Sequence, residues 1–185
     1  MRVARAAAVV WGIGAAAYLV SEAVAAGTVP GYSYIDDYIS DLGVTWVMNT
    51  GFVVHGLLFL LGALLATRSV APGGRLFVLA AAVNAVGNVV IAIFPSHAPD
   101  AAPWHVAGAA MAILGNIAVI LGGQLSPVPA YRRISVGLGV AGILCLMAVA
   151  AGARPAGLIE RGSVYSIVLW ELLAAAVLFR GRPLR

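Results

Sequence analysis

The sequence predicts an all-α membrane protein, a six-transmembrane-helix bundle with a short amphipathic helix at its outer mouth. Three observations indicate this fold class. Of the 185 residues, 62% are hydrophobic and only 10% are charged, whereas a soluble domain carries about 25% charged residues. The apolar residues form runs of about twenty, enough to cross a bilayer core of about 30 Å. The arginines cluster on alternate connections between those runs.

Six apolar runs are the predicted spans, and they make a single transmembrane bundle over residues 1–185. We place them at approximately 6–27, 48–67, 76–94, 104–123, 134–152 and 163–180. The connections are short and contain Pro, Gly and charged residues, as in PSHAPDAAP and SPVPAYRR, which is typical of loops.

The arginines predict the orientation. All eleven basic residues are Arg, and nine of them lie next to the termini or in the second and fourth connections. Only Arg154 and Arg161, in the fifth connection, fall on the other side. The positive-inside rule therefore predicts a multi-pass protein of the cell (inner) membrane, with cytoplasmic N- and C-termini. Because topology explains the net charge of +4, we expect no nucleic-acid partner.

The first connection, GYSYIDDYISDLG at residues 31–43, holds three of the seven acidic residues and three of the six tyrosines. Its SYID segment has the form of a capping box, and Gly43 is placed as a helix stop. One face of the expected helix is apolar: Ile35, Ile39 and Leu42. Asp37, Ser40 and Asp41 share another face. The pattern predicts an interfacial helix over residues 33–42.

Two carboxylates four residues apart on a helix repel each other. Asp37 and Asp41 have this spacing, so we expect a positive group to offset the repulsion. The alternatives are Arg161, Arg154, a divalent cation, or a cationic or metal-bridged lipid head group.

Polar side chains inside the spans are costly and indicate function. We expect them to line one outward-opening pocket together with residues of the first connection: Asp37, Ser40, Asp41, His55, Asn88, His105 and Glu171. His105 shares a helix face with the small Ala109 and Ala112, which leaves space beneath it. The alternative is that the buried polar groups form separate hydrogen-bonded pairs between helices, with no cavity.

Three histidines and several acids raise the alternative of a divalent metal that activates water. The candidate ligands are Asp41, His55, His97 and His105. The interval between His97 and His105 is not a standard spacing for metal ligands. We therefore expect no cofactor. The single cysteine, Cys145, excludes an internal disulfide and a cysteine metal cluster.

Four segments carry a family resemblance: YISDLG, MNTGFVVHG, AIFPSHAPD and WHVAG. They resemble the prokaryotic membrane proteins grouped as domain of unknown function 998 (DUF998), over roughly residues 5–180. YISDLG is also remotely similar to the ISD-x-G motif of the Frag/DRAM/Sfk membrane proteins. The first resemblance implies a six-span architecture. The second points to lipids, and neither supplies a catalytic residue.

Three functions remain open at this point. The first is binding of a membrane lipid or small amphiphile of the cell envelope, by a homo-oligomer or within an envelope protein complex. The second is a membrane-embedded enzyme acting on an outer-leaflet lipid. The third is a small transporter, although the sequence shows no clear inverted repeat.

Overall fold

The computed structural model describes residues 2–68 and 74–180, which form helices and short connections. Six helical segments are long and apolar enough to cross a membrane, as predicted. They are α1 (Arg2–Thr28), α2 (Trp46–Thr67), α3 (Gly74–Ile93), the pair α4 (Ala102–Ile113) and α5 (Gly115–Gly122), α6 (Pro129–Ala150) and α7 (Ala156–Phe179). The described residues also form three short 3-10 helices: η1 (Ile39–Val44), η2 (Pro99–Ala101) and η3 (Gly123–Leu125).

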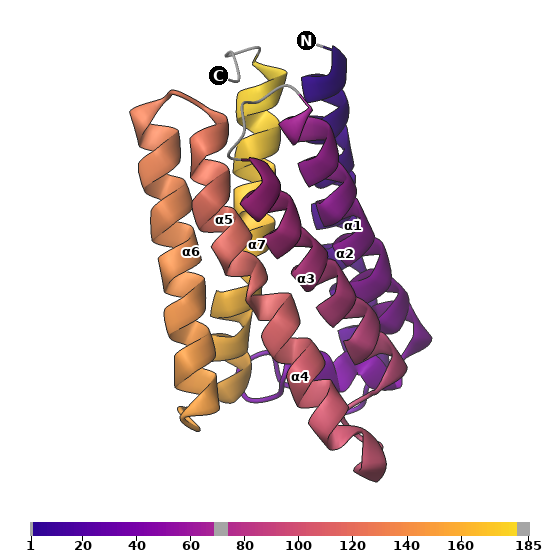
Figure 1. The fold of residues 1–185 in the computed structure, drawn as a ribbon. Coiled ribbons are helices and arrows are strands. Elements are labelled where there is room, and N and C mark those ends of the chain that lie inside the picture. The colour runs from indigo at the N-terminus through magenta and orange to yellow at the C-terminus, as the bar shows by residue number, and fades with distance from the viewer. Residues whose placement is uncertain (1, 69–73, 181–185) are drawn as a thin grey trace.

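The helices form a closed ring, because consecutive helices pack together and α7 packs on both α1 and α6. Both termini lie at one end of the bundle (Figure 1), which we call the terminal face. The opposite end, the η1 face, carries residues 29–45, 94–101 and 151–155. The arginines that motivated the orientation lie at the terminal face, except Arg182 and Arg185, which fall outside the described residues.

Two helices begin earlier than the sequence predicts. α6 begins at Pro129 rather than near residue 134, because proline is well tolerated in the first turn of a helix. α7 begins at Ala156 rather than near residue 163 and therefore includes Glu160 and Arg161. Both charged side chains are buried and have partners inside the protein, so the helix accommodates them.

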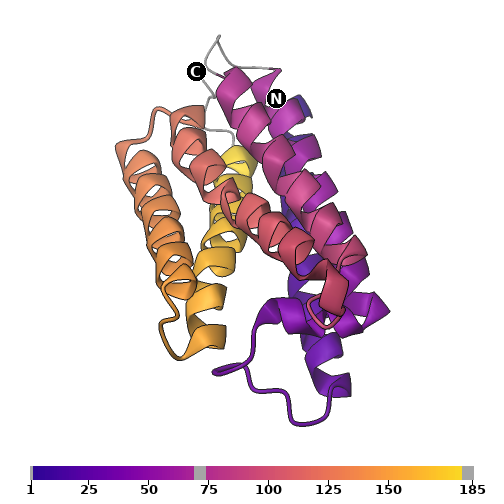
Figure 2. The same cartoon turned by 60° about the horizontal axis from the view of Figure 1, so that its bottom comes forward.

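The fourth span is interrupted at Leu114, and two asparagines satisfy the main chain there. The side-chain amide of Asn84 donates to the carbonyl oxygen of Ala112 at 2.6 Å, and that of Asn116 donates to Ile113 at 2.9 Å. Such bonds permit a break at membrane depth, where unpaired carbonyls are unfavourable. As a result, α4 stays on α3 while α5 packs on α6, and α4 leans away from α6 towards the η1 face (Figures 1 and 2).

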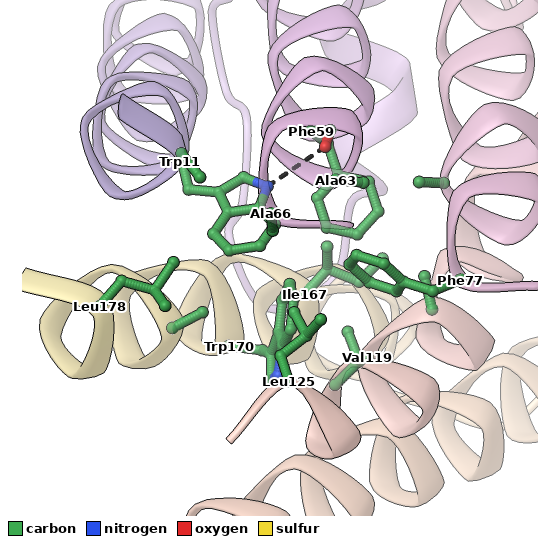
Figure 3. Packing of buried hydrophobic residues seen from close by; sticks show 14 of the residues in the cluster. Trp11, Phe59, Ala63, Ala66, Phe77, Val119, Leu125, Ile167, Trp170 and Leu178 are labelled. Carbon is green, nitrogen blue, oxygen red and sulfur yellow. Dashed lines mark hydrogen bonds between the residues drawn. The ribbon is translucent and has the colours of Figure 1, made fainter. Parts of the chain in front are cut away.

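An aromatic cluster fills the half of the bundle next to the terminal face. Trp11, Phe59, Phe77 and Trp170 pack edge to face there and are at most 2% exposed (Figure 3). The indole N–H of Trp11 donates to the carbonyl of Phe59 at 3.2 Å, so the buried donor is satisfied. This half of the bundle is therefore densely packed and apolar.

The connection between α1 and α2 differs from the predicted helix. A short helix does lie there, but it is the 3-10 helix η1 over Ile39–Val44, preceded by a turn at residues 34–37. Ser33 still acts as a cap, because its hydroxyl accepts from the amide of Asp36 at 3.2 Å. The second bond of a capping box, back to the amide of Ser33, is made by Asp37 rather than by Asp36. The carboxylate of Asp37 accepts from that amide at 2.8 Å.

Candidate functional site

The helix η1 covers the mouth of the bundle at the η1 face. Ile39 and Leu42 anchor it and are at most 1% exposed, whereas Ile35, expected to face down with them, is 56% exposed. The main chain is held as well: the amide of Ile39 donates to the carboxylate of Glu160, and the amide of Leu158 donates to the carbonyl of Ile35 at 2.9 Å. The start of α7 therefore fixes the position of η1.

Arg161 of α7 connects this connecting segment to the helices of the bundle through several hydrogen bonds. Its guanidinium donates to the carbonyls of Tyr34 at 2.7 Å and Asp37 at 3.1 Å, and lies 4.5 Å from the centre of the Tyr34 ring. Its Nε donates to the carboxylate of Glu22, on α1, at 3.0 Å. Arg161 is only 4% exposed, so a buried charge is here both paired and hydrogen-bonded.

Tyrosine hydroxyls complete this network. Tyr165 donates to the second carboxylate oxygen of Glu22 at 2.8 Å, and Tyr32 accepts from Arg161 and donates to the carbonyl of Tyr38 at 3.0 Å. Burial raises the pKa of Tyr32 to about 12, although the hydrogen bond from Arg161 acts in the opposite direction. The phenol is therefore neutral near neutral pH and keeps its donated bond. These contacts explain why tyrosines are concentrated in this connection.

A groove of about 490 Å³ lies between α4 and α6, beneath η1. Polar side chains form one end of it: Tyr38, Ser40, Asp41, Ser96, His105 and Glu160. The hydroxyl of Ser96 donates to the carboxylate of Asp41 at 3.0 Å, which joins η1 to the connection before α4. The structure thus places Asp41, Ser40 and His105 around one groove at the η1 face.

His105 is oriented by the main chain. Its Nδ1 lies 2.8 Å from the carbonyl oxygen of Phe94, which can only accept. In the neutral ring Nδ1 therefore carries the proton and Nε2 carries the lone pair. Stacking of Phe94 on Trp104, with ring centres 5.9 Å apart, supports the same turn.

A second, smaller cavity of about 30 Å³ lies deeper, between α2, α3, α4 and α7. Its polar lining consists of Tyr18, Ser40, His55, Asn84, Asn88 and Glu160. Ser40 and Glu160 also line the groove, so these two residues lie between the two spaces. The volume is enough for about one or two water molecules.

His55 and Glu171 form a buried pair at mid-depth. The Nε2 of His55 lies 3.0 Å from a carboxylate oxygen of Glu171, and the two side chains are 3% and 0% exposed. The ring of Tyr18 packs against the imidazole, with centres 4.9 Å apart. His55 lines the small cavity, whereas Glu171 lies behind it and lines neither space. Glu171, which we expected to line the pocket, therefore lies outside both spaces.

The sequence model of a family described as "Protein of unknown function (DUF998)" matches residues 12–177. The chain belongs to the DUF998 family. The resemblance inferred from the four segments is thus confirmed, and with six candidate spans this is a multi-pass membrane protein. No curated protein and no solved structure matches the chain. Within this DUF998 member, the matched range includes the Arg161 network, the groove and the His55–Glu171 pair.

Two more predicted site residues of this DUF998 protein, Asp37 and His97, lie outside both spaces. The carboxylate of Asp37 accepts from a main-chain amide of its own turn, and His97 is exposed. The four candidate metal ligands are thus spread over the groove, the cavity and the surface. Over residues 2–68 and 74–180, no three His, Cys, Asp or Glu side chains are close enough to share a metal ion.

Three contributors to the site were missed or misjudged from the sequence. Ser96 lies in FPSHAPD, a segment whose composition indicates only a loop. No pattern in the sequence therefore predicts its contact with Asp41. Glu160 was assigned to a connection and was not counted as a site residue. Arg161 was one of the alternatives for offsetting the acidic side chains of the first connection, but it binds main-chain carbonyls there and pairs with Glu22. The adjacent opposite charges of the IERG segment, at the start of an apolar run, were the available signal.

Proposed function

We propose that this DUF998 protein binds a lipid or small amphiphile of the cell envelope in the groove between α4 and α6. The observation that carries the proposal is the composition of the groove, which joins a polar end to an apolar wall between two spans. Its volume of about 490 Å³ lies within the range of about 300–1,000 Å³ that ligand sites usually have.

The polar end favours a head group that is cationic or rich in hydroxyl groups. Asp41 and Glu160 supply carboxylates, and Ser40, Ser96 and Tyr38 supply hydroxyls. The described residues that line the groove include no arginine. An anionic phosphate would meet carboxylates without a cation to balance it, whereas an ammonium or a sugar would find acceptors.

The apolar wall suits a hydrocarbon chain. It consists of Val106, Ala109, Ala110 and Ile113 on α4 and Leu146, Val149 and Ala150 on α6. Two alanines in the middle of the α4 side leave room next to the helix. The interruption at Leu114 supports the same arrangement, because it lets α4 lean away from α6 at the η1 face.

The arginine distribution supports an orientation with the terminal face in the cytoplasm. In that orientation the groove is at the depth of the outer leaflet of the cell membrane. The proposed ligand is therefore an outer-leaflet lipid or an amphiphile that arrives from outside.

The test is binding of three fluorescent single-chain amphiphiles to the purified protein in nanodiscs, with ammonium, sugar and phosphate head groups. We expect the ammonium and sugar probes to bind more tightly than the phosphate probe. Ala110→Trp fills the groove and should abolish binding of all probes. Ala107→Trp is the matched control, because Ala107 is exposed on the same helix and does not line the groove.

Asp41→Asn tests the polar end separately. Losing a charge-assisted hydrogen bond costs about 1.5–3 kcal/mol, so the ammonium probe should bind about 10–100-fold more weakly. The sugar probe should change less. Equal binding by the Ala110→Trp and Ala107→Trp proteins, or preference for the phosphate probe, contradicts the proposal.

A second candidate function is an enzyme acting on the bound amphiphile, and the orientation of His105 favours it. With Nδ1 bound to the Phe94 carbonyl, Nε2 is available as a general base in the groove. Mass spectrometry of the probes after incubation decides between the two. Conversion by the parent protein and its loss in His105→Gln indicate catalysis, whereas recovery of intact probe indicates binding alone.

A further inference from the structure

The His55–Glu171 pair has two buried atoms that the protein does not satisfy. Nδ1 of His55 and Oε1 of Glu171 have no hydrogen-bond partner among the described residues, although both side chains are almost completely buried. Buried polar atoms are paired in the great majority of cases, so each exception requires an explanation. His55 lines the small cavity, which offers room for water next to its ring.

The charge of the pair indicates a shared proton. A carboxylate beside a neutral imidazole would leave one uncompensated negative charge at mid-membrane, which is strongly unfavourable. Two arrangements are neutral: imidazolium with carboxylate, and imidazole with carboxylic acid. In both of them Nε2 is engaged with Glu171 and Nδ1 carries a hydrogen. The unpaired Nδ1 is therefore a donor, and a water molecule in the cavity is a suitable acceptor.

No neighbouring group named below supplies a free positive charge that could balance the carboxylate in place of the shared proton. Tyr18 of α1 is the titratable group that packs on the ring of His55, and Glu160 of α7 lines the same cavity. Farther towards the η1 face, Arg161 is balanced by Glu22. Two asparagines of α3 and one serine of η1 also line the cavity, and all three are uncharged.

The two sides of the pair differ in polarity. Towards the terminal face, Phe59 stacks on His55 with ring centres 6.3 Å apart, and Trp170 precedes Glu171 within the aromatic cluster. Towards the η1 face, Ser40 and Glu160 lie between the cavity and the groove. The pair thus has polar neighbours on the side of the groove and packed apolar neighbours on the other side.

We propose that His55 and Glu171 form a proton-binding site that is loaded from the groove through the small cavity. The ligand is a proton carried by water: a hydronium ion gives its proton to the imidazole–carboxylate pair and leaves a water molecule, so the pair becomes neutral. This site is separate from the amphiphile groove and does not depend on which ligand the groove binds.

The test is ¹⁵N NMR of protein labelled at histidine and held in nanodiscs. The chain has three histidines, so His55→Gln assigns the signals. We expect Nδ1 of His55 to carry a hydrogen near neutral pH and to receive magnetisation from water, with the shared proton between Nε2 and Glu171. Raising the pH should remove one proton from the pair. Glu171→Gln should eliminate this pH-dependent change, because the amide neither binds a proton nor balances the charge of an imidazolium.

The route is tested by Ala109→Leu, which adds bulk where the groove meets the cavity, with Ala107→Leu as the control on the exposed face of α4. Ala109→Leu should remove the water transfer to Nδ1, and Ala107→Leu should leave it intact. A His55 signal that never titrates and receives no transfer from water overturns the proton site. Unchanged transfer in Ala109→Leu overturns the route through the groove.

Discussion

Replacing Arg161 with methionine should strongly destabilise the η1 face. Methionine has a similar length but no charge, so the change leaves the carboxylate of Glu22 buried without its cation. It also removes the donors to the carbonyls of Tyr34 and Asp37. Removing one partner of a buried ion pair costs about 3–5 kcal/mol, a large part of the total stability of about 5–15 kcal/mol.

The expected effect is measurable as a melting temperature. For a chain of about 150–250 residues, 1 kcal/mol shifts Tm by about 2–4 °C, so Arg161→Met should lower Tm by about 6–20 °C. Adding Glu22→Gln removes the stranded charge, and an amide still hydrogen-bonds to Tyr165. The double variant should therefore melt above the single variant, which a role limited to lost packing does not predict.

The assay is thermal unfolding of the detergent-purified protein, followed by intrinsic tryptophan fluorescence. Arg154→Met is the control, because Arg154 is exposed at the same face, two residues before α7. Surface charges contribute about 0–1 kcal/mol, so this variant should melt within a few degrees of the parent. The reasoning is refuted if Arg161→Met melts as high as Arg154→Met, or if Glu22→Gln lowers Tm further in the double variant.

Three other predictions concern Tyr32, Gly157 and the orientation of the protein in the membrane. The pKa of Tyr32 is raised from 10.0 to about 12, so its stabilising contribution is complete below pH 10 and is lost as the pH rises towards 12. Phenolate absorbance should contain a step near pH 12 that Tyr32→Phe removes; loss of a step near pH 10 in that variant instead contradicts this. Gly157→Ala should lower Tm, because a Cβ there would contact the carbonyl of Asp37, whereas Gly12→Ala has nothing within 4 Å and should not. A cysteine replacing Asp36 should react with an impermeant maleimide in intact cells, and one replacing Arg75 only after permeabilisation; the reverse would invert the orientation.

The architecture was predictable because it depends on composition and length. Six apolar runs and alternate arginine clusters locate six helices and place both termini at one face, and the structure confirms this. Asp41, Ser40 and His105 were also expected near one another, since all three lie at the same end of the predicted spans. These inferences need only the helical rise and the order of the segments along the chain.

The remainder depends on side-chain contacts that hydropathy does not encode. The early start of α7 was missed because the charges of Glu160 and Arg161 indicate a loop. Only their partners in the structure explain why they lie within a buried part of the helix. The interruption at Leu114 was missed because it depends on Asn84 reaching the Ala112 carbonyl from another helix. The η1 helix replaced the predicted amphipathic helix because Arg161 binds main-chain carbonyls of the preceding turn.

The Arg161 network and the His55–Glu171 pair should be separable in function, because they hold different parts of the protein. Arg161 fixes the connection that carries Ser40 and Asp41, which form the polar end of the groove. His55 is fixed by Phe59 and Glu171, which do not belong to that connection. At a temperature where Arg161→Met is still folded, binding of the ammonium amphiphile should therefore weaken while the water transfer to Nδ1 of His55 persists. Loss of both signals together would mean that η1 also closes the proton site, and that the two sites form a single unit.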